Sequence, residues 1–454
     1  MTKTLSITIS QIFSVLLNFC VQLILARFYG KHGAGTYLSI MSLMNILSVL
    51  GLFGINNYYI FLKSKNGYIS KLVASSIIQI YFLMNITSVF LIIILGLINF
   101  YEYLFLIISS IFMMILTNYI AIISSYIQVK EKIVKVSLIQ LTIPFLKIIG
   151  LFGGALIMQP LFKGYSFIIL IISSIMIALF SIKYFKIIFK YNILKFDNFY
   201  STFKSLIPYA ILNITFLLYT QANTFYVGIW MDSKNAAYFG LAYLFLNTIF
   251  VLPTAIYQRL LAHKLIYLLY NSIEEFKKLM SNLQDLLIIL SSIMILLLYV
   301  SAKYLITILF GENYFKSIEI LQLLTFIIPF RLLSISIGTV LSNDDYIKER
   351  IKVELFVTFF NFLLNLILIK NIGVTGAILS SIITEMILSF SFANVMRKKL
   401  KIKVKVKLYL PLIIVIFIFI TNLPHYIEYL IILLMCIILV KPILSRLNVI
   451  KNYL

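Results

Sequence analysis

Long apolar runs separated by short polar stretches fill almost the whole chain. A helix that crosses the hydrocarbon core of a bilayer needs about 20 mostly apolar residues, and runs of that length recur along the sequence. The short alternating segments typical of an outer-membrane barrel are absent from it. The pattern predicts an all-α polytopic membrane protein with about fourteen transmembrane helices, over residues 8–28, 37–60, 72–98, 103–127, 136–158, 165–187, 205–229, 236–262, 281–303, 317–342, 350–370, 374–396, 408–422 and 425–444.

Composition and charge agree with a membrane protein. Apolar residues make up 62% of the chain and charged residues 12%, whereas soluble domains have about 45–50% and about 25%. The net charge of +23 does not indicate nucleic-acid binding, because most of the cations lie in one alternating set of loops, where anionic headgroups attract them. The positive-inside rule places these loops and both termini in the cytoplasm.

An internal repeat supports a two-lobed organisation. The stretch GTYLSIMSLMNIL (35–47) opens the second expected span, and AAYFGLAYLFLNTI (236–249) opens the eighth. The two are offset by six spans, an even number, so the halves would be parallel repeats around an axis along the membrane normal. We expect a six-helix lobe over residues 1–200, a second over 201–400, and two further helices within 401–454.

Two cations lie inside expected spans, where ionisable side chains usually face a protein interior or a water-filled cavity. Lys147 is near the middle of the fifth span and Arg331 near the middle of the tenth, and each follows a proline, Pro144 or Pro329. Proline interrupts helical hydrogen bonding and can bend a helix. Gln140 lies two turns before Lys147, on the same face of a continuous helix. Each cation either lines a substrate cavity or pairs with a neighbouring helix for structural reasons.

Acidic residues are distributed unequally between the halves. Glu385 lies well inside the twelfth span, where it is either a proton- or cation-coupling site or the partner of Arg331. In the first half, Glu102, Glu131 and Asp197 all lie in or beside loops. The N-terminal lobe therefore carries mid-membrane positive charge without mid-membrane negative charge.

Uncharged polar residues recur at helical spacing in the spans that lead the two expected lobes. They are Gln11, Ser14, Asn18 and Gln22 in the first span, and Asn213, Thr220 and Thr224 in the seventh. Either helix packing or a wet lumen accepts such faces, and their position at the start of both lobes favours a shared cavity. The two cysteines lie in apolar runs and are expected to be buried free thiols. The three histidines are scattered along the chain, and we expect neither a metal nor a cofactor.

Four stretches, in order along the chain, resemble elements of polysaccharide transporters in the MATE-like flippase superfamily. They are LARFYGKHGAGTYLS (25–39), FYVGIWMDSKNAAYFGLA (225–242), TILFGENYFKSIEILQLL (307–324) and NFLLNLILIKNIGVTGAILSSIITE (361–385). The second is a looser match. An acid often precedes that element in the family, whereas this chain has Gln221 and Asn223 there, which argues against an acid-dependent role at this point. Within the first, the glycines of 30–37 lack the order of a phosphate-binding loop and predict a tight outward hairpin with a close helix start.

The resemblance implies a Wzx-type flippase with two MATE-like six-helix lobes and two additional C-terminal helices. Such proteins move undecaprenyl-pyrophosphate-linked repeat units from the cytoplasmic to the periplasmic leaflet of the bacterial inner membrane, for O-antigen (lipopolysaccharide) or capsule biosynthesis. It implies alternating access, coupling to an ion gradient, no enzymatic step, and contacts with membrane lipids, a polysaccharide polymerase and a chain-length regulator.

The residues fit that function in specific places. A buried pyrophosphate needs a counter-charge, which Lys147 and Arg331 would supply. The sugars would contact Gln11, Asn18, Gln22, Gln140 and Asn213. Arg27, near the outer interface, either guides a departing pyrophosphate or extends its side chain to the headgroups.

Two other classes of function fit less well. A drug or cation antiporter of the same superfamily would need an acidic site in the N-terminal lobe, and the sequence has none there. A membrane enzyme such as a polysaccharide polymerase or glycosyltransferase would use large periplasmic loops with acids or arginines, whereas the outward loops expected here are short.

Overall fold

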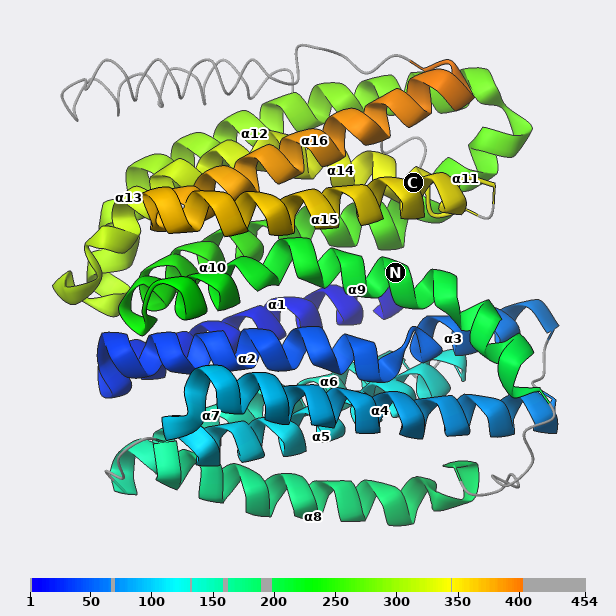
Figure 1. Ribbon diagram of the computed structural model, residues 1–454. Coiled ribbons are helices and arrows are strands. Elements are labelled where there is room, and N and C mark those ends of the chain that lie inside the picture. The colour runs from blue at the N-terminus through cyan, green and yellow to red at the C-terminus, as the bar shows by residue number, and fades with distance from the viewer. Residues whose placement is uncertain are drawn as a thin grey trace. The chain divides into compact units, whose positions relative to one another are not determined.

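The computed structural model describes residues 2–66, 70–130, 133–157, 162–188, 198–343 and 345–402, and within these ranges the chain is helical without a strand. The helices in chain order (Figure 1) are α1 (Thr2–Ile24), η1 (Leu25–Tyr29), α2 (Gly30–Leu52), α3 (Ile55–Asn66), α4 (Lys71–Phe100), η2 (Tyr101–Tyr103), α5 (Leu104–Val129), α6 (Ile133–Gln140), α7 (Thr142–Ile157), α8 (Lys163–Ile188), α9 (Phe199–Trp230), α10 (Ser233–Ala255), η4 (Ile256–Leu261), α11 (Ala262–Asn271), α12 (Ile273–Phe310), η5 (Glu312–Tyr314), α13 (Lys316–Leu324), η6 (Thr325–Ile327), α14 (Ile328–Val340), α15 (Ile347–Ile372) and α16 (Val374–Leu400).

The helices confirm the all-α membrane fold expected from the apolar pattern. Each of the first twelve expected spans corresponds to one helix or to a run of interrupted helices. Within the described residues, 9 such helical runs are long and apolar enough to cross a membrane. The last two expected spans, over 408–422 and 425–444, lie outside the described residues.

The glycine-rich stretch 30–37 turns at only one of its glycines. Gly30 has a φ of 65°, the left-handed backbone that favours glycine, and α2 begins there. Gly35 lies inside α2, where a Cβ would overlap the backbone carbonyl of Ser233 at the start of α10. His32 Nδ1 lies 3.0 Å from Ser233 Oγ. The turn expected in this stretch lies at Gly30. The close approach of α2 to the start of α10 depends on a different glycine, Gly35.

Two interruptions occur where the prolines predict them. Helix α6 ends at Gln140, and α7 begins at Thr142 with Pro144 in its first turn. A 3-10 turn over Thr325–Ile327 precedes α14, in which Pro329 occupies the first turn. Because Pro144 has no N–H, the carbonyl of Gln140 lacks its usual helical donor. Lys147 and Arg331 thus follow similar backbone interruptions.

A third interruption has no proline. Between α2 and α3, Phe53 has a φ of 46° and Gly54 a φ of 71°. A Cβ on Gly54 would lie 2.6 Å from the backbone nitrogen of Ala210 in α9, so only glycine allows this approach. Asn85 Nδ2 of α4 donates to the carbonyl of Gly51 at 3.1 Å, which supplies a hydrogen bond at the place where the helix ends.

A chain of neutral side chains continues from this interruption into the first unit's core. Asn118 Nδ2 of α5 donates to Asn85 Oδ1 at 2.7 Å, and Ser48 Oγ of α2 donates to Asn118 Oδ1 at 2.6 Å. All three side chains are buried. This Ser48–Asn118–Asn85 network joins α2, α4 and α5 without using a charge.

The chain forms two compact units, Met1–Ala237 and Tyr238–Leu454. The first unit extends past residue 200 to include α9, which packs against α2, α3 and α4, while α8 packs against α5 and α7 (Figure 1). Apolar side chains from α3, α4 and α9 form a buried cluster of Ile55, Tyr58, Ile77, Ile80 and Leu206. In the second unit, α15 packs along α16, and α14 packs against α16.

Candidate functional site

Lys147 is the cation that the first unit places in a membrane span. Its side chain lies half-buried on the face of α7 that also carries the buried residues Pro144, Leu151 and Gly154. Within the described residues, Lys147 makes no ion pair and no hydrogen bond. The described acids of this unit, Glu102 and Asp232, are exposed outside the long helices. A cation withdrawn from water without a counter-charge is unfavourable, so the position suits a site that receives an anion.

The polar face of α1 is described from residue 13 onward. Asn18 Nδ2 donates to the carbonyl of Ser14 at 2.8 Å, so this amide serves its own helix. Gln22, one turn later, has a buried Oε1 without a hydrogen-bond partner among the described residues. Arg27 is exposed in the π-helical turn Leu25–Tyr29. Gln11 belongs to α1, but its side chain lies outside those that the structure describes.

Gln140 and Lys147 lie on either side of a short interruption. Gln140 is the exposed last residue of α6, and the single turn residue Leu141 separates it from α7, which carries Lys147. Their position on one shared face stays a prediction.

The polar residues of α9 are also used locally. Asn213 Oδ1 accepts a hydrogen bond from Asn57 Nδ2 of α3 at 3.3 Å, and Thr220 donates to the carbonyl of Phe216 in its own helix. Gln221 Oε1 accepts a hydrogen bond from Asn45 Nδ2 of α2 at 3.2 Å. These contacts hold α9 against α2 and α3.

Arg331 pairs with Glu385 inside the second unit. Arg331 Nη1 of α14 lies 2.5 Å from Glu385 Oε1 of α16, and the two side chains are only 10% and 6% exposed. The second oxygen, Glu385 Oε2, is buried and has no hydrogen-bond partner among the described residues. Of the two roles left open by the sequence, the partnership with Arg331 is confirmed, and the coupling role stays a prediction.

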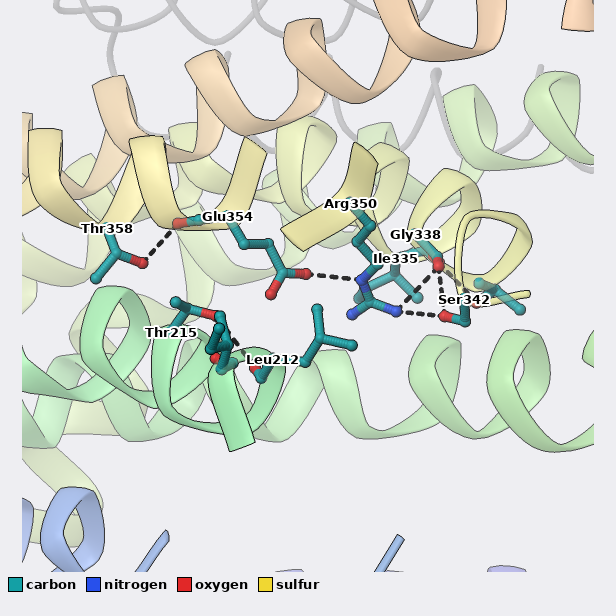
Figure 2. Close-up of polar contacts among 10 residues, drawn as sticks. Leu212, Thr215, Ile335, Gly338, Ser342, Arg350, Glu354 and Thr358 are labelled. Atoms are coloured by element: carbon teal, nitrogen blue, oxygen red, sulfur yellow. Dashed lines mark hydrogen bonds and ion pairs between the residues drawn. The ribbon is translucent and has the colours of Figure 1, made fainter. Parts of the chain in front are cut away.

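A second buried ion pair, which the sequence reasoning did not assign, lies beside the first. Arg350 Nε donates to Glu354 Oε1 at 2.7 Å, and Glu354 is only 1% exposed (Figure 2). The same guanidinium donates to the carbonyl of Gly338 at 3.1 Å and to Ser342 Oγ. The Gly338 carbonyl, near the end of α14, also accepts a hydrogen bond from Ser342 Oγ at 2.7 Å, so Arg350 is its second donor. The spacing of four residues could have predicted this ion pair, because Arg350 and Glu354 are neighbours on the surface of one helix.

A row of buried amides and hydroxyls also joins α15 to α16. Asn361 Nδ2 donates to Thr384 Oγ1 at 2.9 Å, and Ser380 Oγ donates to Asn365 Oδ1 at 2.7 Å. Asn365 Nδ2 bonds back to Asn361. The sequence reasoning missed these residues, although the two asparagines lie one turn apart in an apolar span. Their hydrogen bonds fix the helix that carries Glu385.

The arrangement offers charge and polar groups and no metal site among the described residues. Within those residues, no group of three or more His, Cys, Asp or Glu side chains can hold a metal ion. Among the described residues, the first unit presents a half-buried cation without a partner, and the second presents two ion pairs with buried carboxylates and an amide row beside them. Such a set of groups can bind and release an anion by electrostatic attraction.

Comparison with known proteins gives the fold. No protein-family model matches the chain, and no curated protein matches it in sequence. Lipid II flippase MurJ, in an inward closed conformation, is similar with a TM-score of 0.66 and 18% identity over 98% of this chain and 99% of that chain. The MATE multidrug transporter DinF-BH is similar with a TM-score of 0.59 and 14% identity, over 88% of this chain and 94% of that one. The eukaryotic MATE transporter AtDTX14 gives 0.55 and 11%, over 91% and 98%.

These similarities extend over nearly the full length of each protein, so the chain has the fold of MurJ and of the MATE transporters. Together with the long apolar helices, this makes the chain a multi-pass membrane protein. The identities are too low for the substrates of those proteins to be carried over.

Proposed function

We propose that the protein is a Wzx-type flippase that moves undecaprenyl-pyrophosphate-linked oligosaccharide repeat units from the cytoplasmic to the periplasmic leaflet. The observation that carries the proposal is Lys147, a half-buried cation in a membrane span without an ion pair among the described residues. The fold supports it, since MurJ is named as a lipid II flippase. Four sequence stretches that resemble polysaccharide transporters extend from residue 25 to residue 385.

The chemistry of the substrate explains the charge pattern. A pyrophosphate linked to lipid and sugar carries negative charge that must cross a region of low dielectric, and an unpaired ion there costs several kcal/mol. Lys147 offers a positive charge to offset this cost, and Arg331 offers a second one when it separates from Glu385. The amides and hydroxyls of α1 and α9 would contact the sugars, while the polyprenyl tail remains in lipid.

The remaining elements of the proposal follow from this substrate. Transport proceeds by alternating access and is coupled to an ion gradient, without covalent chemistry or a cofactor. The protein belongs in the bacterial inner membrane with both termini in the cytoplasm, and it supplies a polymerase and chain-length regulator that build O-antigen or capsule. Arg27, exposed at the turn between α1 and α2, would meet the pyrophosphate as it leaves.

The main alternative is a drug or cation antiporter, because MATE transporters share the fold. Such a protein needs an acidic group to bind its cationic substrate or coupling ion. In the first unit, the described membrane helices carry Lys147 and no buried acid. A cationic substrate would therefore be repelled where an anionic one is attracted.

Substitution of Lys147 tests the proposal. In the source bacterium without its chromosomal copy, Lys147→Ala is expected to reduce surface polysaccharide at least about tenfold, the effect of about 1.4 kcal/mol of lost anion binding. Lys147→Arg should retain part of the activity because it keeps the charge. Arg331→Ala is expected to fail as well, with Arg331→Lys partly active.

The matched control is Lys204→Ala, which removes an exposed lysine from the start of α9. Surface polysaccharide and the amount of each variant in the membrane are measured together. Full complementation by Lys147→Ala at a normal protein level would contradict the proposal.

A further inference from the structure

The two buried glutamates of the second unit differ in how they are neutralised. Glu354 is held by Arg350, which is anchored at the same time to Gly338 and Ser342 (Figure 2). Glu385 is held through one oxygen by Arg331, and its other oxygen is buried without a hydrogen-bond partner among the described residues. Within the described part of the chain, Glu385 therefore depends on Arg331 for its counter-charge.

Loss of Arg331 would leave Glu385 as a buried, unpaired carboxylate. Removal of one partner from a buried ion pair is strongly unfavourable, because the remaining charge is isolated from water. A carboxyl group in this situation persists in its neutral, protonated form. The structure shows the ion pair, and its separation would need a proton on Glu385 together with another anion on Arg331.

We propose that the lipid-linked pyrophosphate and Glu385 compete for Arg331, so that Glu385 takes up one proton when the pyrophosphate binds and releases it when the ion pair re-forms. This inference rests on the proposed function and names the proton that Glu385 exchanges when the substrate binds and leaves. One proton adds to one carboxylate oxygen, and Arg331 exchanges one anionic partner for another. The doubly esterified pyrophosphate carries two negative charges, of which Arg331 offsets one while the protonated Glu385 adds none.

The neighbouring groups favour this exchange. Glu354 of α15 is paired with Arg350, so it offers Glu385 no counter-charge. Helix α10 presents neutral groups, among them the ring of Phe250, whose centroid lies 6.0 Å from the Arg331 guanidinium carbon. The charged residues Lys316 and Glu319 of α13 are exposed. Within the described residues, a proton is thus the available replacement for Arg331.

The experiment measures proton uptake on ligand binding by the purified full-length protein in detergent. The ligand is a short-chain farnesyl-pyrophosphoryl sugar, whose doubly esterified pyrophosphate keeps its charge between about pH 6 and pH 8. In weak buffer with a pH indicator, the wild-type protein is expected to take up close to one proton per ligand bound. Its affinity should then weaken by up to about tenfold per pH unit as the pH rises.

Two variants that keep the shape of the side chain show which carboxyl group takes up the proton. Glu385→Gln removes the competitor and the titrating group, so binding should tighten, lose its pH dependence and take up no proton. Glu354→Gln changes the other buried carboxyl and should keep the uptake. Glu319→Gln is the exposed control.

Different outcomes contradict the proton exchange at Glu385 and the proposed flippase function. Wild-type protein that binds the ligand without proton uptake would overturn the inference and leave the flippase proposal standing. Uptake that survives in Glu385→Gln, or disappears in Glu354→Gln, would also overturn it. Failure of the wild-type protein to bind or flip any lipid-linked pyrophosphate would instead overturn the proposed function.

Discussion

Lys147 in the first unit and Arg331 in the second follow similar proline-associated interruptions, but their electrostatic surroundings are opposite. Arg331 meets Glu385 at 2.5 Å, whereas Lys147 has no counter-charge among the described residues. The polar core of the first unit is instead built from neutral groups, with Ser48, Asn85 and Asn118 as its centre. The second unit thus neutralises a buried cation with its own acid, whereas the described part of the first unit offers Lys147 no such acid.

Loss of Glu385 should have the largest effect on stability. Glu385→Ala leaves the Arg331 guanidinium buried without its partner, at an expected cost of about 3–5 kcal/mol. The free energy of unfolding is measured by denaturant titration in detergent. The double variant Arg331→Leu with Glu385→Leu removes both charges and should be close to neutral, since a well-packed apolar pair replaces a buried ion pair at little cost. A loss below about 1 kcal/mol in Glu385→Ala would show that Arg331 reaches water or another acid.

Loss of one side chain from the Ser48–Asn118–Asn85 network should lower the free energy of unfolding by less than the loss of Glu385. Asn118→Ala leaves Ser48 and Asn85 without one partner each, and we expect a loss of about 1–3 kcal/mol. The control is Asn99→Ala, because among the described residues Asn99 donates only to the carbonyl of Leu95 in its own helix. A loss in Asn118→Ala as large as that in Glu385→Ala would remove the contrast between the two units.

Neutralisation of Lys147 should have the smallest effect on stability and the opposite sign. Lys147→Met fills a similar volume and removes a half-buried charge that has no partner among the described residues, so unfolding should become about 0–1 kcal/mol less favourable. Activity should nevertheless be lost, as it is expected to be for Lys147→Ala. The same titration measures the change, with Lys204→Met as the exposed control. A clear destabilisation would mean that Lys147 has a structural partner.

Much of the fold follows from local sequence signals, and the site follows only in part. Apolar runs predict the helices, and prolines predict two of the interruptions, because both effects act within a few residues. The interruption at Phe53–Gly54 escaped prediction, since it lies in an apolar run and depends on the approach of Ala210 from α9. The pairing of Arg331 with Glu385, 54 residues apart, remained one of two alternatives for the same reason. Spacing along the sequence indicates which residues share a face of one helix. The ion-pair partner of a residue on another helix depends on how the helices pack together.

The contact between α2 and α9 has a consequence for how the protein is made. Ser42 donates to the carbonyl of Gln221, 179 residues later in the chain. At roughly 5–20 residues per second, a ribosome needs about 10–35 s to synthesise that interval. During this time α2 is in the membrane without the helix that covers its Ser42 and Asn45. Helices α4 and α5 emerge earlier and can satisfy Ser48, so the inner part of α2 can pack first while the side that meets α9 waits for its partner.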